Sequence, residues 1–327
     1  VSKVLMREQN LLLITRLKSC SYYYIGVIKK YLSRTPQWLF MYVFGRFSSI
    51  QIMMLNYYQR QRTAKVYEEK DSVFSHLNTD EVVKSLIADG LYLGIHLPDS
   101  WVREIREFAE RNNCYGDGNL RLSFAYQERL AAQSSYGQSF RLGKYYNASL
   151  LCPAIEKLAR DPKLLNIAAK YLKVESVHAG SWLWWSFPPT AAIYESTAAI
   201  GQVFHHDLED YRCLRFYFYL SDTTLANGPH VCIRGSHRQK KLAYLLSLWR
   251  LRSEQDVIDY YGTSRIVTIC GPAGFGFVED PFCVHKGLPP TKGDRLILAI
   301  HFSINDYGVL GDRDDSLLLN SSQLTSK

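Results

Sequence analysis

Residues 201–302 decide the fold, and three short segments within them carry the decisive side chains: QVFHHD at 202–207, VHKG at 284–287 and GDRLI at 293–297. His205 and Asp207 are separated by one residue. Residues two apart on a strand point to the same side, so one imidazole and one carboxylate can face the same ion. His206 then points the opposite way. A distant histidine would complete a set of three ligands, and we predict that it is His285. Two histidines and one carboxylate leave open positions on an octahedral metal, as in non-haem Fe(II) enzymes that handle O2.

Short strand patterns dominate from residue 177 onward, and a turn signal, NGP at 227–229, separates two of them. Many short strands with turn signals indicate a mainly β protein with a double-stranded β-helix core, the cupin-like jelly roll. Strands that converge on one mouth can bring His205, Asp207 and His285 together. A helical insertion is expected over 240–252. The expected strands are 181–187, 213–220, 265–270, 274–278, 282–285 and 295–303.

Helical patterns precede these strands and are expected to flank the barrel. Thr79 or Asp80 can cap a helix that Gly90 ends, and a second helix begins at Asp99 or Ser100. First-turn prolines predict helices over 153–160 and 162–172. A short strand is expected over 91–95. Residues 112–148 are rich in Gly, Ser, Gln and Tyr, which fits either a cover over the substrate or a plain surface loop.

The chain resembles the phytanoyl-CoA dioxygenase family of Fe(II)/2-oxoglutarate-dependent oxygenases. The resemblance rests on the His205-x-Asp207 pair and on four segments and extends upstream to about residue 80. It implies that His205, Asp207 and His285 bind Fe(II). It also implies that Arg295, ten residues after His285, binds the far carboxylate of 2-oxoglutarate. Many members have a small hydroxyl residue where this chain has Gly287. The segments are NGPH at 227–230, GSH at 235–237, HKG at 285–287 and GDR at 293–295.

The family resemblance implies an oxidoreductase that uses O2 and 2-oxoglutarate to hydroxylate a C–H bond of a small-molecule or lipid-like substrate, with release of succinate and CO2. Related halogenases lack the carboxylate at the position of Asp207, so its presence favours hydroxylation. Two alternatives stay open. One is a cupin-type metalloenzyme that does not use 2-oxoglutarate, and the other is a non-catalytic jelly-roll binding module.

Other histidines and one glycine-rich segment have structural interpretations. His230 and His237 lie in Gly-Pro-His and Gly-Ser-His segments, where we expect them to shape turns. His301 shares a strand face with Arg295 and is expected to be a core histidine. The planar guanidinium of Arg295 suits pairing with a buried carboxylate. The segment GPAGFG at 271–276 lacks the order of a dinucleotide-binding loop and predicts a tight turn.

The net charge of +8 belongs to the N-terminal part of the 327-residue chain. Residues 1–65 contain eleven Lys and Arg against one acid, leaving 28 basic and 30 acidic residues for the remainder. We therefore divide the chain into a basic, aromatic helical extension (1–70), an oxygenase domain (71–310) and a flexible tail (311–327). No nucleic-acid-binding signature accompanies the basic charge, so nucleic acid is not expected as a partner.

The extension contains an apolar stretch, 37–58, that is expected to be helical. Polar residues interrupt it, so it does not predict a transmembrane helix. It fits either a helical collar packed on the barrel or, with the rest of 1–65, peripheral contact with an anionic membrane. No secretory leader is apparent, and the seven cysteines show no Cys-x-x-Cys pair. We expect reduced thiols and a cytoplasmic location. If the extension contacts an anionic membrane, the protein would lie peripherally at the membrane surface. The oligomeric state is not indicated.

Overall fold

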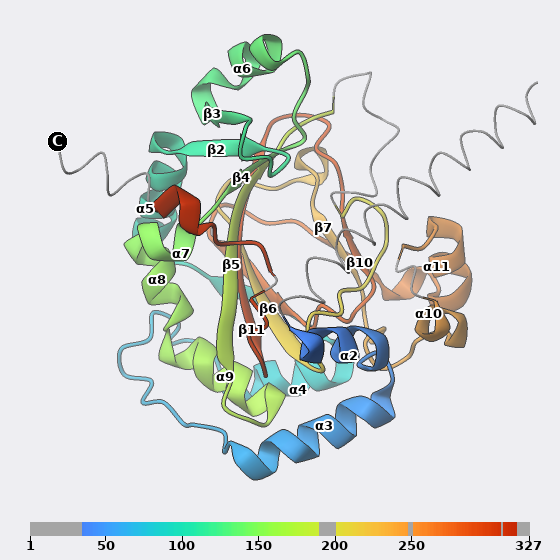
Figure 1. Cartoon of the computed structure of the whole chain (residues 1–327). Helices are drawn as coiled ribbons and strands as arrows, with labels where there is room; N and C mark the ends of the chain where they lie inside the picture. The colour runs from blue at the N-terminus through green and yellow to red at the C-terminus, as the bar shows by residue number, and fades with distance from the viewer. Residues whose placement is uncertain (1–34, 190–200, 248–250, 309, 319–327) are drawn as a thin grey trace, which may run out of the picture.

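The computed structural model describes residues 35–189, 201–247, 251–308 and 310–318, and two antiparallel sheets form its centre. This architecture, with helices on its outer side, confirms the predicted fold class (Figure 1). The eight-stranded sheet has the order β1 (Leu91–His96), β9 (Phe275–Glu279), β6 (Cys213–Tyr219), β11 (Arg295–Ser303), β5 (Val177–Ser186), β4 (Leu142–Tyr145), β2 (Asn113–Gly116) and β3 (Ser123–Ala125). The three-stranded sheet has the order β10 (His285–Gly287), β7 (His230–Ile233) and β8 (Ile266–Ile269).

Strand β11 lies at the centre of the large sheet, and all nine of its residues are buried. Side chains alternate across a strand, so its two faces meet different partners. Leu296 and Leu298 belong to the core cluster on the helical side, whereas Ile297 and Ala299 pack with residues between the sheets. Arg295 is two residues before Ile297, so its side chain lies on the same face of the strand. The alternation therefore directs this arginine into the space between the two sheets.

Helices cover the outer face of the large sheet (Figure 1). The Asn78 side chain caps α4 by accepting from the Asp80 and Glu81 amides, so the cap lies one residue before the predicted Thr79. Gly90, at φ 70°, ends α4 in the left-handed conformation that glycine adopts without a steric penalty. The helices of this layer are α4 (Thr79–Asp89), α5 (Asp99–Arg111), α7 (Ala148–Leu151), α8 (Pro153–Ala159) and α9 (Pro162–Leu172).

Residues 112–148 are more ordered than the plain loop considered from sequence. Strand β4 pairs with β5, β2 pairs with β4, and β3 pairs with β2, so this segment extends the large sheet. Helix α6 (Arg129–Tyr136) follows β3 and has no buried residue. The strands are three or four residues long, and short strands give little alternation for a sequence pattern to detect.

The described part of the extension, from residue 35 onward, forms helices α2 (Pro36–Phe44) and α3 (Ser48–Gln61), so the prediction of one continuous helix over 37–58 is wrong. The break has a tertiary cause. Arg46 turns inward, where its guanidinium donates to the Ser247 carbonyl at 2.9 Å and to the Tyr42 carbonyl at 2.8 Å. Trp38 and Met41 are buried in a cluster with Leu208 and Tyr211, as expected of a collar. No helix in the described ranges is long and apolar enough to cross a membrane.

The insertion after β7 also differs from its prediction. In place of one helix over 240–252, a short helix α10 (Leu242–Leu246) is followed by α11 (Glu254–Tyr261), which the Ser253 side chain caps; 248–250 lie outside the described residues. Residues 311–318, the described part of the predicted flexible tail, contact the large sheet. Asp312 is buried there and accepts a 2.9 Å hydrogen bond from the Ser181 amide. The predictions for 1–34 and 319–327 lie outside the described residues.

Candidate metal centre

Backbone pairing brings the two distant histidine segments together. The His205 amide donates to the His285 carbonyl at 2.9 Å, and the His285 amide donates back at 2.8 Å. Strand β10 begins at His285, three residues later than predicted, because Asp280 accepts from the Phe282 amide and holds a turn there. The Asp207 amide donates to the Pro281 carbonyl at 2.8 Å. Segment 205–207 is therefore fixed beside the start of β10.

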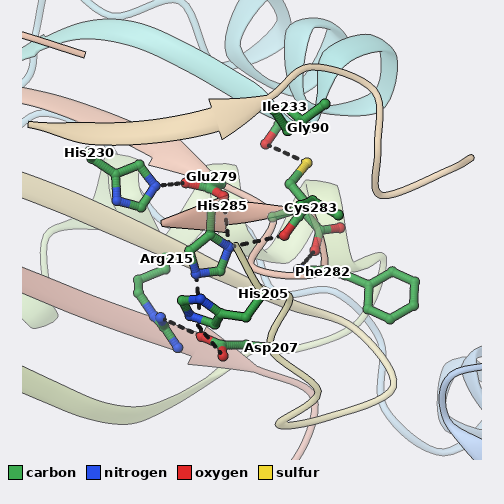
Figure 2. A network of polar contacts seen from close by, with 12 residues as sticks. Gly90, His205, Asp207, Arg215, His230, Ile233, Glu279, Phe282, Cys283 and His285 are labelled. Carbon is green, nitrogen blue, oxygen red and sulfur yellow. Dashed lines mark hydrogen bonds and ion pairs between the residues drawn. The ribbon is translucent and has the colours of Figure 1, made fainter. Parts of the chain in front are cut away.

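The three predicted ligands converge (Figure 2). His205 Nε2 lies 3.8 Å from Asp207 Oδ1, and His285 Nε2 lies 3.8 Å from Asp207 Oδ2. One ligand atom from each residue lies within 4.8 Å of the other two. Two imidazole nitrogens and one carboxylate oxygen at this spacing can hold a single ion.

Both imidazoles present Nε2 to this centre because carbonyl groups hold the other nitrogen. His205 Nδ1 lies 2.8 Å from the Val203 carbonyl, and His285 Nδ1 lies 2.9 Å from the Cys283 carbonyl. A neutral ring that donates from Nδ1 leaves a lone pair on Nε2, which is how second-shell partners fix a metal-binding tautomer. Burial lowers the pKa of His285 to about 4. Its ring is therefore neutral at neutral pH and available as a ligand.

Arg215, on β6, contacts the carboxylate of the centre and was not recognised from the sequence. Its Nη1 donates to Asp207 Oδ2 at 2.9 Å and to the Tyr217 hydroxyl at 3.0 Å, and it also pairs with Glu209. The guanidinium stacks over Trp182, 4.7 Å from the ring centroid. The sequence feature that could have identified Arg215 is its position as a single arginine within an otherwise apolar strand pattern.

Glu279, on β9, lies behind His285 and was also missed (Figure 2). It is fully buried, with Oε2 2.6 Å from His230 Nε2 and Oε1 3.3 Å from His285 Nδ1. Burial raises the pKa of Glu279 to about 8. Glu279 is also the cross-strand partner of Arg215. The two ionisable residues missed from the sequence are therefore neighbours in the sheet and flank the centre.

Arg295 lines the same cavity as the triad, whose volume is about 200 Å³. The side chain is buried, and Nη2 donates to Ser186 Oγ at 3.0 Å. Its Nε and Nη1 have no hydrogen-bond partner among the described residues. Gly287 also lines this cavity and offers no hydroxyl. Ser186 is the residue whose hydroxyl contacts the guanidinium.

The other predicted structural histidines do not belong to the group of three converging ligand atoms, although the His230 ring stacks on His285 with centroids 5.3 Å apart. The His206 ring packs edge-on against Phe282 with centroids 5.2 Å apart, as expected for the opposite face. His230 lies on β7 rather than in a turn, and His237 Nδ1 is 3.6 Å from Cys283 Sγ. His301 is fully buried, with Nδ1 3.4 Å from Arg215 Nε. Its surroundings are more polar than the apolar core expected from the sequence.

Comparisons with known proteins give distant structural similarities. The non-heme alpha ketoglutarate dependent epimerase SnoN from nogalamycin biosynthesis is 14% identical, with a TM-score of 0.46 over 69% of this chain and 82% of its own. HygX from Streptomyces hygroscopicus, with nickel, 2-oxoglutarate and hygromycin B bound, is 16% identical, with a TM-score of 0.45 over 68% and 86%. EctD from S. alaskensis, with 2-oxoglutarate and 5-hydroxyectoine, is 14% identical, with a TM-score of 0.46 over 74% and 80%. No family model and no curated protein matches the chain. Similarities this distant do not assign a function.

Proposed function

We propose that this protein is an Fe(II)- and 2-oxoglutarate-dependent dioxygenase that hydroxylates a C–H bond of a small-molecule or lipid-like substrate. The observation that carries the proposal is the state of Arg295. Its buried guanidinium has two nitrogens without a hydrogen-bond partner among the described residues, in the cavity that also holds the triad. A buried charge is costly unless it is paired. A dicarboxylate that reaches both the metal and Arg295 satisfies this requirement.

The donor set fits Fe(II). His205, Asp207 and His285 would supply two imidazole nitrogens and one carboxylate oxygen, and three protein ligands leave positions for exogenous ligands. When bound, Fe(II) supplies the redox chemistry that couples O2 to oxidative decarboxylation of 2-oxoglutarate, giving succinate and CO2. Asp207 supplies the carboxylate whose presence favours hydroxylation over halogenation.

The surrounding residues bind, orient and exclude water. Arg295 would pair with the far carboxylate of 2-oxoglutarate through its planar donors, and the Ser186 hydroxyl holds the guanidinium in place. Trp184, Tyr217 and Ile297 line the same cavity and limit the water around the reacting groups. Although burial lowers the pKa of Arg295, a guanidinium remains protonated in proteins.

The two alternatives from the sequence account less well for these residues. A cupin-type metalloenzyme without 2-oxoglutarate has no need for a buried cation beside the metal. A non-catalytic binding module has no need for two imidazoles held with Nε2 toward a common carboxylate. The incompletely paired Arg295 therefore favours a dicarboxylate co-substrate over both alternatives.

The test combines metal binding with turnover. Purified full-length protein should bind one Fe(II) per chain under anaerobic conditions and, with O2, release succinate from 2-oxoglutarate. His205→Ala and His285→Ala should lose both activities while retaining the unfolding transition of the unaltered protein. Near-normal succinate release by either folded variant would contradict the ligand assignment. Metal binding without any 2-oxoglutarate turnover, even with a broad set of candidate substrates, would contradict the co-substrate.

A further inference from the structure

A second cavity, of about 380 Å³, lies beside the candidate metal centre. Asp207, one of the three predicted ligands, lines both cavities. Sites for small organic molecules are commonly about 300–1,000 Å³. One wall is a single face of α3, with the i, i+3, i+4, i+7 spacing of a helix. The residues of that face are Ser48, Gln51, Ile52 and Leu55.

Helix α3 lies over this cavity and also packs, through Ile50, Leu55 and Tyr58, against the edges of two core clusters. It has no buried residue, and Ile52 is 60% exposed although it lines the cavity. Arginines on either side of the helix anchor it. Before α3, Arg46 donates to the Ser247 carbonyl, and after it, Arg62 donates to the Ile304 carbonyl, each at 2.9 Å. The helix is thus fixed at both ends, and the face that lines the cavity carries two polar and two apolar side chains.

Three cations that line the cavity form their hydrogen bonds and ring contacts with neutral groups among the described residues, and the charge of Asp280 also acts on one of them, Lys240. Lys240 donates to the Ser236 and Phe282 carbonyls, and Arg238 donates to the Ile87 carbonyl at 3.2 Å. Arg212 lies over the Tyr171 ring, 4.4 Å from its centroid. None of these three cations forms a salt bridge with a carboxylate in the described part of the chain.

The acids that line the cavity are engaged by other groups. Asp210 accepts from the amides of Asn305 and Tyr211, each at 2.7 Å. Asp280 accepts from the Tyr171 hydroxyl at 2.5 Å and from a backbone amide, and Asp207 accepts from Arg215. The wall therefore combines cations that lack carboxylate partners with the apolar side chains of α3.

We infer that this cavity binds the substrate, and that the substrate is a small organic anion with an apolar body. Its carboxylate or phosphate would lie near Arg212 and Lys240, and its apolar part would lie against Ile52 and Leu55. Only the identification of this molecule as substrate rests on the proposed function; binding itself requires neither metal nor turnover. The N-terminal collar is then part of the active site, because α3 supplies one wall.

Calorimetry on the full-length, metal-free protein tests this inference, with octyl phosphate below its micelle concentration as the probe. We expect octyl phosphate to bind. Inorganic phosphate lacks the apolar chain and octanol lacks the anionic group, so each should bind at least about tenfold more weakly. Arg212→Gln, which removes the cation, and Leu55→Trp, which fills the cavity, should each weaken binding at least about tenfold. Arg103→Gln, an exposed arginine on α5, is the matched control and should bind as the unaltered protein does.

The other outcomes are equally informative. Unchanged octyl phosphate binding in both folded cavity variants would overturn the inference. A second result would also overturn it: no binding of octyl phosphate, together with binding to anionic vesicles that persists in Leu55→Trp. The anion that the protein recognises would then be a membrane surface. Arg295→Ala should leave octyl phosphate binding intact. Intact binding in a protein that never consumes 2-oxoglutarate would contradict the proposed function alone.

Discussion

Arg215 Nη1 donates a 2.9 Å hydrogen bond to Asp207 Oδ2, the same oxygen that lies 3.8 Å from His285 Nε2. The guanidinium thus orients the carboxylate of the candidate metal centre. Arg215 is itself held by the Tyr217 hydroxyl at 3.0 Å and by stacking over Trp182. We therefore regard Arg215 as a positioning residue for Asp207.

Arg215→Gln should weaken Fe(II) binding about 10–100-fold, as the loss of outer-shell partners of metal ligands commonly does. The physical reason is that Asp207 loses the charged partner that fixes its orientation. Anaerobic Fe(II) titration measures the effect. Arg234→Gln is the control, because Arg234 pairs with Asp89 at 3.0 Å on the exposed surface and should leave metal affinity unchanged. Equal affinity of folded Arg215→Gln and the unaltered protein would show that Asp207 is positioned by other contacts.

Arg295→Ala should raise the 2-oxoglutarate requirement tens-fold or more and leave Fe(II) binding largely intact. Loss of one member of a buried charge pair costs about 2–5 kcal/mol. Calorimetric titration of 2-oxoglutarate into the metal-loaded, anaerobic protein measures the change. Ser186→Ala, which removes only the hydroxyl that holds the guanidinium, should have a smaller effect. An unchanged requirement in Arg295→Ala would indicate a different anchor or a different co-substrate.

Glu279 should make the stability of the metal-free protein depend on pH. Burial raises its pKa from 4.5 to about 8. Between these values the folded protein retains a proton that the unfolded chain releases, so the contribution of Glu279 falls as pH rises. The slope for one proton is at most about 1.4 kcal/mol per pH unit. Glu279→Gln imitates the protonated carboxyl, so its free energy of unfolding should increase relative to the unaltered protein as pH rises from 5 to 8.

Urea unfolding of both proteins at several pH values between 5 and 8 measures this difference. Glu107→Gln provides a control, because Glu107 is exposed and pairs with Arg111 at 3.2 Å on the surface of α5. Its curve should run parallel to that of the unaltered protein. A parallel curve for Glu279→Gln as well would show that Glu279 is ionised in the folded protein throughout this range.

Local patterns predicted many of the strands and helices, and the ligand set was predicted from the His205-x-Asp207 spacing together with the family resemblance. The strand expected over 295–303 is β11, and the His205-x-Asp207 spacing predicted two side chains on one side. Arg215 and Glu279 were missed for a different reason. They face each other only through the register of β6 with β9, which joins residues far apart in sequence. No local pattern specifies that register.

The remaining differences follow from tertiary contacts and short elements. The break between α2 and α3 depends on Arg46 reaching the Ser247 carbonyl, 201 residues away. Strands β2, β3 and β4 are too short to show alternation. The start of α11 was readable, because Ser253 precedes Glu254 and caps the helix through the Asp256 amide. The predicted helix, 240–252, ended before this cap and did not use it.

The collar and membrane alternatives for the extension predict opposite effects of Trp38→Ala. Trp38 is 5% exposed, stacks on Tyr42 and packs with Leu208 and Tyr211. If this packing stabilises the fold, its loss should lower the free energy of unfolding by about 3–5 kcal/mol. Phe40→Ala, at a side chain 43% exposed, should change it by about 0.5 kcal/mol or less. Urea unfolding and co-sedimentation with anionic vesicles separate the alternatives. If Trp38→Ala leaves the free energy of unfolding unchanged but reduces salt-sensitive vesicle binding, this ring contacts a membrane surface and does not stabilise the barrel.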